Sequence, residues 1–141
     1  ERERRADAVV AAAEAWLGTE RGKWFAWVHV YDPHTAYAAP EAWASRFPAD
    51  PYLGEVSWTD AALGPLFDRL ARESRPTLVI VTADHGESLG EHGEITHGTF
   101  AYEATLRVPL IVAELGPGAT AGDGTQAAVN AHVRHVDLLV T

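Results

Sequence analysis

The feature that most constrains the fold of this chain is a short apolar run, residues 77–83, which ends abruptly at Asp84 and His85. The run reads Thr-Leu-Val-Ile-Val-Thr-Ala, and most of its residues are β-branched. Such a run, ended by polar residues and glycine, is typical of a strand that is covered on both faces of a parallel sheet. A sheet covered in this way needs helices on each face, so the run predicts an α/β fold.

Apolar periodicity predicts further helices and strands on either side of this run. Residues 3–17 and 55–71 each carry an apolar stripe at helical spacing. Residues 24–31 and 108–114 are short apolar, β-branched segments and predict two more strands. Because helices and strands alternate along the chain, we expect a mostly parallel sheet that binds its ligands at the carboxyl ends of its strands.

The composition indicates one globular domain without a nucleic-acid surface. The 141 residues, 47% hydrophobic and 22% charged, suffice for a single domain, 1–141, with its own core. Acidic residues outnumber basic ones by 20 to 11, and the formal net charge of −9 would repel a phosphate backbone. The absence of cysteine excludes a disulfide and a thiolate zinc site. No apolar run approaches the length of a membrane span.

Two of the predicted strands end next to polar side chains that are able to form a site. His34 follows the first strand, and Asp84 and His85 follow the strand at 77–83. In a parallel sheet both strand ends lie at the same edge, where Asp84 and His85 offer an oxygen and a nitrogen ligand to a divalent cation. His34 could donate a proton or a hydrogen bond near that cation, and His97 could return to the same edge. Two or three ligands do not complete a catalytic metal site, so further carboxylates and a nucleophile must come from elsewhere.

Each of these residues also has a simpler interpretation. Asp84 could only cap the turn that follows the strand, and His34 could be an ordinary polar loop residue. A histidine in a loop of glycine and threonine, such as His97, is usually just solvated. Glu87 belongs either to a solvated acidic loop or to the support of a ligand, and His92 either supports the site or lies at the surface.

Five blocks of the sequence, taken together, resemble a known family of proteins. These blocks are residues 25–34, 52–60, 79–93, 102–112 and 135–141. In order and in approximate spacing they resemble the C-terminal part of the catalytic core of the sulfatase family, within the alkaline phosphatase superfamily. The Asp-His-Gly-Glu sequence that begins at Asp84, with Gly-Glu-His downstream, is the most specific of them. The resemblance implies a three-layer, alkaline-phosphatase-like α/β core that is only partly present here.

The resemblance also implies roles for individual residues. It implies that Asp84 and His85 bind the metal, and that His34 contacts the sulfate or phosphate group and protonates the leaving oxygen. His97 stands where many sulfatases have a lysine that binds the ester oxygens. A histidine there keeps a donor but loses a permanent charge, which leaves phosphate, phosphonate and phosphodiester substrates open.

For the whole enzyme, the resemblance implies a sulfuric ester hydrolase that acts on sulfate esters of small molecules or glycans. The cofactor would be a divalent metal ion, with Ca²⁺ first and Mn²⁺, Mg²⁺ or Zn²⁺ as alternatives. A phosphoryl or phosphonate ester hydrolase, a phosphoethanolamine-type transferase of the same superfamily, and a catalytically inactive module are the alternative functions. A periplasmic or secreted location follows from the resemblance alone.

Parts of the family's machinery are absent from this sequence. It contains neither the N-terminal acidic metal ligands nor a Cys/Ser-x-Pro-x-Arg motif, from which sulfatases make their formylglycine nucleophile. The chain also lacks methionine, and both of its ends look cut. We therefore expect a fragment of a longer enzyme that is inactive alone. Strands without their sheet neighbours would expose apolar edges, which favours self-association.

Overall fold

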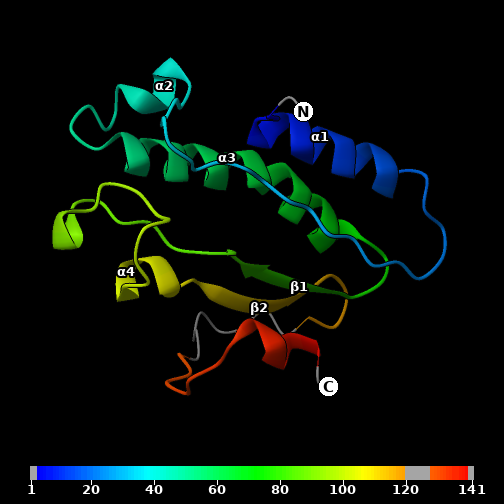
Figure 1. The fold of residues 1–141 in the computed structure, drawn as a ribbon. Helices are drawn as coiled ribbons and strands as arrows, with labels where there is room; N and C mark the ends of the chain where they lie inside the picture. Colours follow the sequence, from blue (N-terminus) through cyan, green and yellow to red (C-terminus); the bar gives the residue numbers. More distant parts are fainter. Residues whose placement is uncertain (1–2, 120–127, 140–141) are drawn as a thin grey trace.

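The structure, a computed structural model, describes residues 3–119 and 128–139 of the chain. Its elements are, in chain order, α1 (Ala6–Leu17), α2 (Glu41–Ala44), α3 (Pro51–Arg72), β1 (Thr77–Thr82), the 3₁₀ helix η1 (Glu91–Gly93), α4 (Glu103–Leu106), β2 (Leu110–Leu115) and the 3₁₀ helix η2 (His135–Leu139). Helices α1 and α3 pack against each other on one side of the two strands (Figure 1). The mixed helix and strand content agrees with the predicted α/β class.

Helix α3 is the longest element, and local sequence signals explain both of its ends. The Asp50 side chain accepts a hydrogen bond from the Leu53 N–H at 2.9 Å, and a proline occupies the first helical position. Arg69 and Arg72 lie in the last turn, where positive charge stabilises the carboxyl end of a helix. The helix therefore begins before the predicted span of 55–71, because its capping sequence precedes the apolar stripe.

The hydrophobic core lies between the two long helices and one face of the sheet. Val10 and Leu17 of α1 pack against Leu66 and Leu70 of α3, and all four are at most 8% exposed. Partly buried residues surround this cluster: Trp24, Val28, Leu63, Val79 and Leu115. The apolar stripes predicted for 3–17 and 55–71 therefore do face the core.

The sheet differs from the predicted parallel arrangement. Strands β1 and β2, the two strands found in residues 3–119 and 128–139, pair antiparallel, with Thr77 opposite Leu115 and Thr82 opposite Leu110. A parallel pair needs a crossover of a dozen or more residues, usually a long helix, whereas the connection here contains only the short η1 and α4. The helical layer also covers just one face of β1, since Leu78 on the other face is 66% exposed. The three-layer core stays a prediction.

Residues 24–31 are extended but form no strand of the sheet. Their side chains alternate between exposed and partly buried, as expected for a strand. Trp24 and Val28 contact the core, whereas Phe25 and Trp27 are 80% and 81% exposed. The predicted strand at 24–31 therefore has the side-chain pattern of a strand, but no neighbouring strand among the described residues pairs with it.

No helix in the described part of the chain combines the length and apolarity needed to cross a membrane.

Candidate functional site

The loop that carries His34 is held by hydrogen bonds from two helices. At its start, Asp32 Oδ2 accepts the N–H of Ala6, the first residue of α1, at 2.6 Å. Farther along, the two oxygens of Glu55 on α3 accept the N–H of His34 at 2.9 Å and the N–H of Ala38 at 3.0 Å. Glu55 is only 4% exposed. The backbone of His34 is therefore attached directly to α3.

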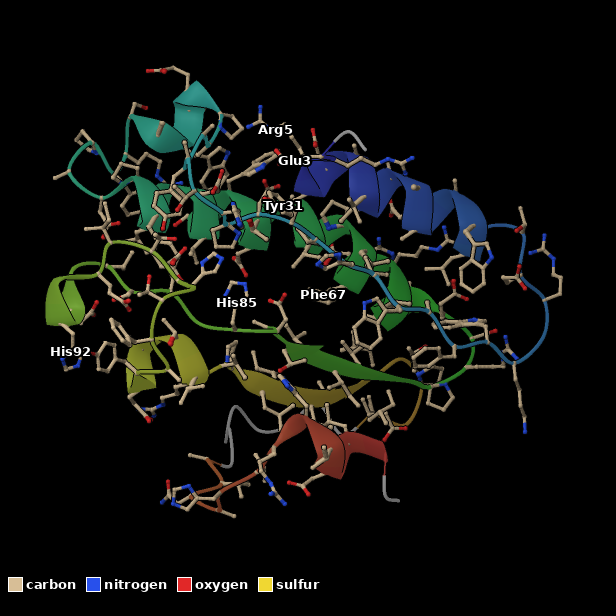
Figure 2. All side chains as sticks on the ribbon, in the orientation of Figure 1. Glu3, Arg5, Tyr31, Phe67, His85 and His92 are labelled. Carbon is tan, nitrogen blue, oxygen red and sulfur yellow. The ribbon has the colours of Figure 1, made fainter. Side chains whose placement is uncertain are left out.

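The turn after β1 places Asp84 and His85 at the surface of the candidate site. Asp84 is 79% exposed, and its Oδ1 accepts the N–H of His85 at 3.0 Å. The same oxygen lies 3.8 Å from His85 Nε2. Gly86 then packs tightly against α4, where its N–H donates to the Thr105 carbonyl at 2.8 Å. In Figure 2, His85 points from this turn toward α3.

The structure brings three of the four predicted site residues into one cluster, His34, His85 and His97, which we call the histidine cluster. The ring centroids of His85 and His97 are 4.0 Å apart, and those of His34 and His97 are 5.3 Å apart. His85 and His97 lie in the connection between β1 and α4, whereas His34 comes from a loop that is distant in the sequence. The fourth residue, Asp84, adjoins the cluster through its neighbour His85. His92 lies elsewhere, at η1, where its ring stacks on Tyr102 with a centroid distance of 4.0 Å.

In all three rings of the histidine cluster, the Nδ1 atom lies next to an oxygen acceptor. The acceptors are the Thr35 carbonyl for His34 at 2.7 Å, the Gly86 carbonyl for His85 at 2.8 Å and Glu87 Oε1 for His97 at 3.0 Å. Carbonyl and carboxylate oxygens only accept, so Nδ1 carries a hydrogen in each ring. Each neutral ring then presents Nε2 as its available nitrogen. Metal-binding histidines commonly show the same arrangement, with the non-ligating N–H held by a carbonyl or carboxylate.

Glu87 supports the cluster from below the surface. Its side chain is 7% exposed, and it accepts the Tyr37 hydroxyl at 3.0 Å in addition to its contact with His97. Burial raises the pKa of Tyr37 above its ordinary value of 10.0, and the hydrogen bond and charge of Glu87 raise it further. Tyr37 therefore remains a neutral donor at physiological pH. Of the two interpretations of Glu87, the solvated acidic loop is wrong, because the side chain is buried.

Sequence reasoning missed several of the residues that shape this site. Tyr31 stacks on the His34 ring with a centroid distance of 4.4 Å, and its hydroxyl lies 3.0 Å from His34 Nδ1. Tyr37 and Glu55 make hydrogen bonds to residues that are 50 and 21 positions away. No local pattern predicts contacts at such separations. The sole signal for Glu55 was its place in the family-like block at residues 52–60.

Asp84 and His85 fit a divalent cation only as part of a larger ligand set. Within residues 3–119 and 128–139, no three His, Asp or Glu side chains come together in a way that could hold a metal ion. Asp84 offers an exposed carboxylate and His85 an Nε2, so the donor types suit such an ion. Ca²⁺ needs six to eight oxygen ligands, which these two residues alone do not supply.

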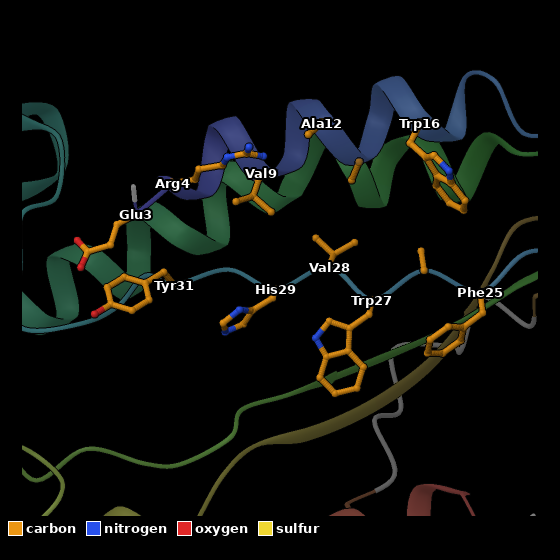
Figure 3. A pocket seen from close by; sticks show the side chains of 12 residues that line it. Glu3, Arg4, Val9, Ala12, Trp16, Phe25, Trp27, Val28, His29 and Tyr31 are labelled. Atoms are coloured by element: carbon orange, nitrogen blue, oxygen red, sulfur yellow. The ribbon is translucent and has the colours of Figure 1, made fainter. Parts of the chain in front are cut away.

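An open groove elsewhere on the molecule does not belong to this site. It runs between α1 and residues 25–31 (Figure 3), and the side chains of Val28 and Trp27 leave the extended segment in opposite directions. Val9, Trp16 and Phe25 line it together with the charged residues Glu3 and Arg4, so its walls are of mixed polarity. None of the predicted catalytic or metal-binding residues lines the groove.

The family of the chain follows from its similarity to known proteins. The sulfatase family model matches residues 3–141, so the chain belongs to the sulfatase family, and the resemblance found in the sequence blocks is confirmed. It is similar to an uncharacterized sulfatase, YidJ, of Escherichia coli (strain K12), with 35% identity over 91 residues, which is 64% of this chain and 17% of that protein.

Two further relatives match about half of the chain. A choline-sulfatase of Rhizobium meliloti (strain 1021) is 38% identical over 73 residues, and PehA of Trinickia caryophylli, a multifunctional alkaline phosphatase superfamily protein, is 36% identical over 74 residues. Each match covers 50% of this chain and 14% of the relative. The chain therefore spans less than a fifth of the length of these relatives. No solved structure gives a significant match.

Proposed function

We propose that the protein to which this chain belongs is a metal-dependent hydrolase of sulfate esters. The observation that carries the proposal is the histidine cluster, in which three rings with anchored Nδ1 atoms lie close together and leave their Nε2 atoms available, and in which His85 directly follows Asp84. Such nitrogens can bind a cation when the ring is neutral, and they can donate to an oxyanion or transfer a proton when the ring is protonated. The family supports this reading, since its members named here include sulfatases.

In this proposal, the residues of the cluster divide the work between them. His34 is the general acid: when the bond between the sulfur and the ester oxygen breaks, the protonated ring gives its Nε2 proton to the leaving alkoxide. In its protonated form, His97 donates from Nε2 to a non-bridging oxygen while its Nδ1–H is held by Glu87. Asp84 and His85 would contribute two ligands to the metal. When bound there, the cation would screen the charge that builds up on the oxygens and would lower the pKa of the nucleophile.

The remaining machinery must be supplied by other sequence. This chain has no cysteine and no Ser-x-Pro-x-Arg motif that could yield formylglycine, so we expect the 141 residues alone to be inactive. A relative named choline-sulfatase favours a small sulfate ester as the substrate. The relative named a multifunctional alkaline phosphatase superfamily protein, together with a histidine at position 97, supports phosphoryl or phosphonate esters as the second candidate.

Kinetics of the full-length protein test the assignment of His34. The His34→Ala variant should turn over an alkyl sulfate about 10² to 10⁴ times more slowly than the wild type, because it lacks the general acid. Its metal content, measured by elemental analysis, should stay unchanged. His132→Ala is the matched control, since His132 is exposed and lies outside the cluster. Unchanged turnover in His34→Ala would rule out this role.

Elemental analysis tests the metal ligand separately. Asp84→Asn keeps the size of the side chain but removes the charge that attracts a cation, so the purified full-length variant should contain much less divalent metal than the wild type. Asp68→Asn is the control, because Asp68 is an exposed carboxylate on α3, 74% exposed and far along the helix from the site. A metal content equal to that of the wild type would remove Asp84 from the ligand set.

A further inference from the structure

Glu55 is a buried carboxylate that the proposed reaction does not use. It lies near the start of α3, is 4% exposed, and uses each of its two oxygens for one backbone N–H of the loop that carries His34. Burying a carboxylate costs free energy unless its oxygens are hydrogen-bonded, and charged acceptors make the stronger hydrogen bonds. The arrangement therefore ties a stable helix to an irregular loop.

Two close contacts of the His34 ring do not by themselves tie its segment to the core. Tyr31 stacks on the ring and the Thr35 carbonyl accepts from Nδ1, but both residues belong to the same segment as His34. These contacts orient the ring within the segment. The bond from His34 N–H to Glu55 is different, because it joins the backbone of His34 itself to α3, which packs in the core.

We propose that Glu55 is a positioning residue, which holds the His34 loop on α3 so that the His34 ring stays beside His97. This inference rests on the proposed function, since it assumes that His34 is the general acid. The reason is geometric: proton transfer requires the acid within hydrogen-bond reach of the leaving oxygen, and a displacement of about 1 Å can cost about 100-fold in rate. Glu55 contacts only backbone groups, so it takes no part in the chemistry itself.

The test uses Glu55→Gln in the full-length protein, with two sulfate esters as substrates. Glutamine has the same size but only one acceptor oxygen, and its NH₂ would face one of the two N–H donors. General acid catalysis matters most for a poor leaving group. We therefore expect kcat for an alkyl sulfate to fall about 10- to 100-fold, with a clearly smaller loss for 4-nitrophenyl sulfate. Asp68→Asn, which removes a carboxylate from the exposed face of the same helix, should change neither value.

Two further measurements keep the proposal open to refutation. Hydrogen exchange of the His34 and Ala38 amides should be faster in Glu55→Gln than in the wild type. Glu55→Asp, which retains two acceptor oxygens at shorter reach, should lose less kcat for the alkyl ester than Glu55→Gln. It also serves in place of Glu55→Gln where that variant does not fold.

The outcomes separate this proposal from the proposed function. Equal losses of kcat for the two esters, or no loss, in Glu55→Gln overturn the positioning role while His34→Ala still behaves as a general-acid variant. If His34→Ala itself shows no preference between leaving groups, the role of His34 has failed. Amide exchange then decides whether the contact with Glu55 exists: unchanged exchange at His34 and Ala38 overturns it.

Discussion

Gly86, in the turn that carries Asp84 and His85, offers a direct test of how tightly this turn is packed. A Cβ atom at Gly86 would lie 2.1 Å from the Ala104 carbonyl oxygen and 2.9 Å from the Arg107 carbonyl oxygen. Both oxygens belong to the backbone in and next to α4, so they cannot rotate away as a flexible side chain would. Alanine at this position must therefore push the turn and α4 apart by about 1 Å to reach ordinary van der Waals contact.

The cost follows from two contributions. Forcing an extra carbon into a packed region destabilises by about 1–3 kcal/mol. The same displacement breaks the bond from Gly86 N–H to the Thr105 carbonyl, now 2.8 Å long, which contributes about 0.5–1.5 kcal/mol. We therefore expect Gly86→Ala to lower the free energy of unfolding by about 2–4 kcal/mol. In the full-length protein the displaced turn should also reduce the bound metal.

Urea unfolding followed by tryptophan fluorescence measures this change, and Gly22→Ala is its control. Apart from its chain neighbours, a Cβ at Gly22 would meet nothing within 4 Å. Alanine there should raise the free energy of unfolding by about 0.5–1 kcal/mol, because it removes backbone freedom from the unfolded chain. Opposite signs for the two substitutions support the packing argument. A change at Gly86→Ala smaller than about 0.5 kcal/mol would refute it, since that is the size of an ordinary surface effect.

Three further predictions follow from the contacts of the site and from the exposed segment. The raised pKa of Tyr37 means that the folded state holds the phenol proton more tightly than the unfolded state. This stabilisation is present below pH 10.0 and is lost as the pH rises beyond it. When urea unfolding is measured as the pH rises beyond that value, the free energy of unfolding should fall less in Tyr37→Phe than in the wild type. Glu87→Gln removes the carboxylate that holds His97, and in the full-length protein it should lower kcat by about 10-fold at unchanged bound metal, whereas an unchanged kcat would argue against the support. Phe25 and Trp27 are 80% and 81% exposed, and such apolar side chains favour self-association. The chain should therefore elute from size-exclusion chromatography above its monomer mass, and the Trp27→Ser variant should elute closer to the monomer mass. A clean monomer of the wild type would contradict this.

Several parts of the fold could be predicted from the sequence because they depend on local patterns. The apolar stripes of α1 and α3 and the β-branched runs of β1 and β2 lie where their periodicity placed them. The direction of β2 could not be predicted in this way. A continuous apolar run indicates that a strand is buried but does not fix the direction of the strand beside it, which depends on how the connection between the strands folds.

The same division holds for the candidate site. Sequence alone determined the family of the chain and selected His34, Asp84, His85 and His97 as candidate site residues, because short motifs keep their residue types and spacing. Tertiary structure alone decided that the three imidazoles lie together with their Nδ1 atoms anchored. It also decided that Glu55, 21 residues away, holds the backbone of His34. The physical reason is that hydrogen bonds between distant segments depend on where the packed core brings the backbone, and local sequence patterns do not report such distances.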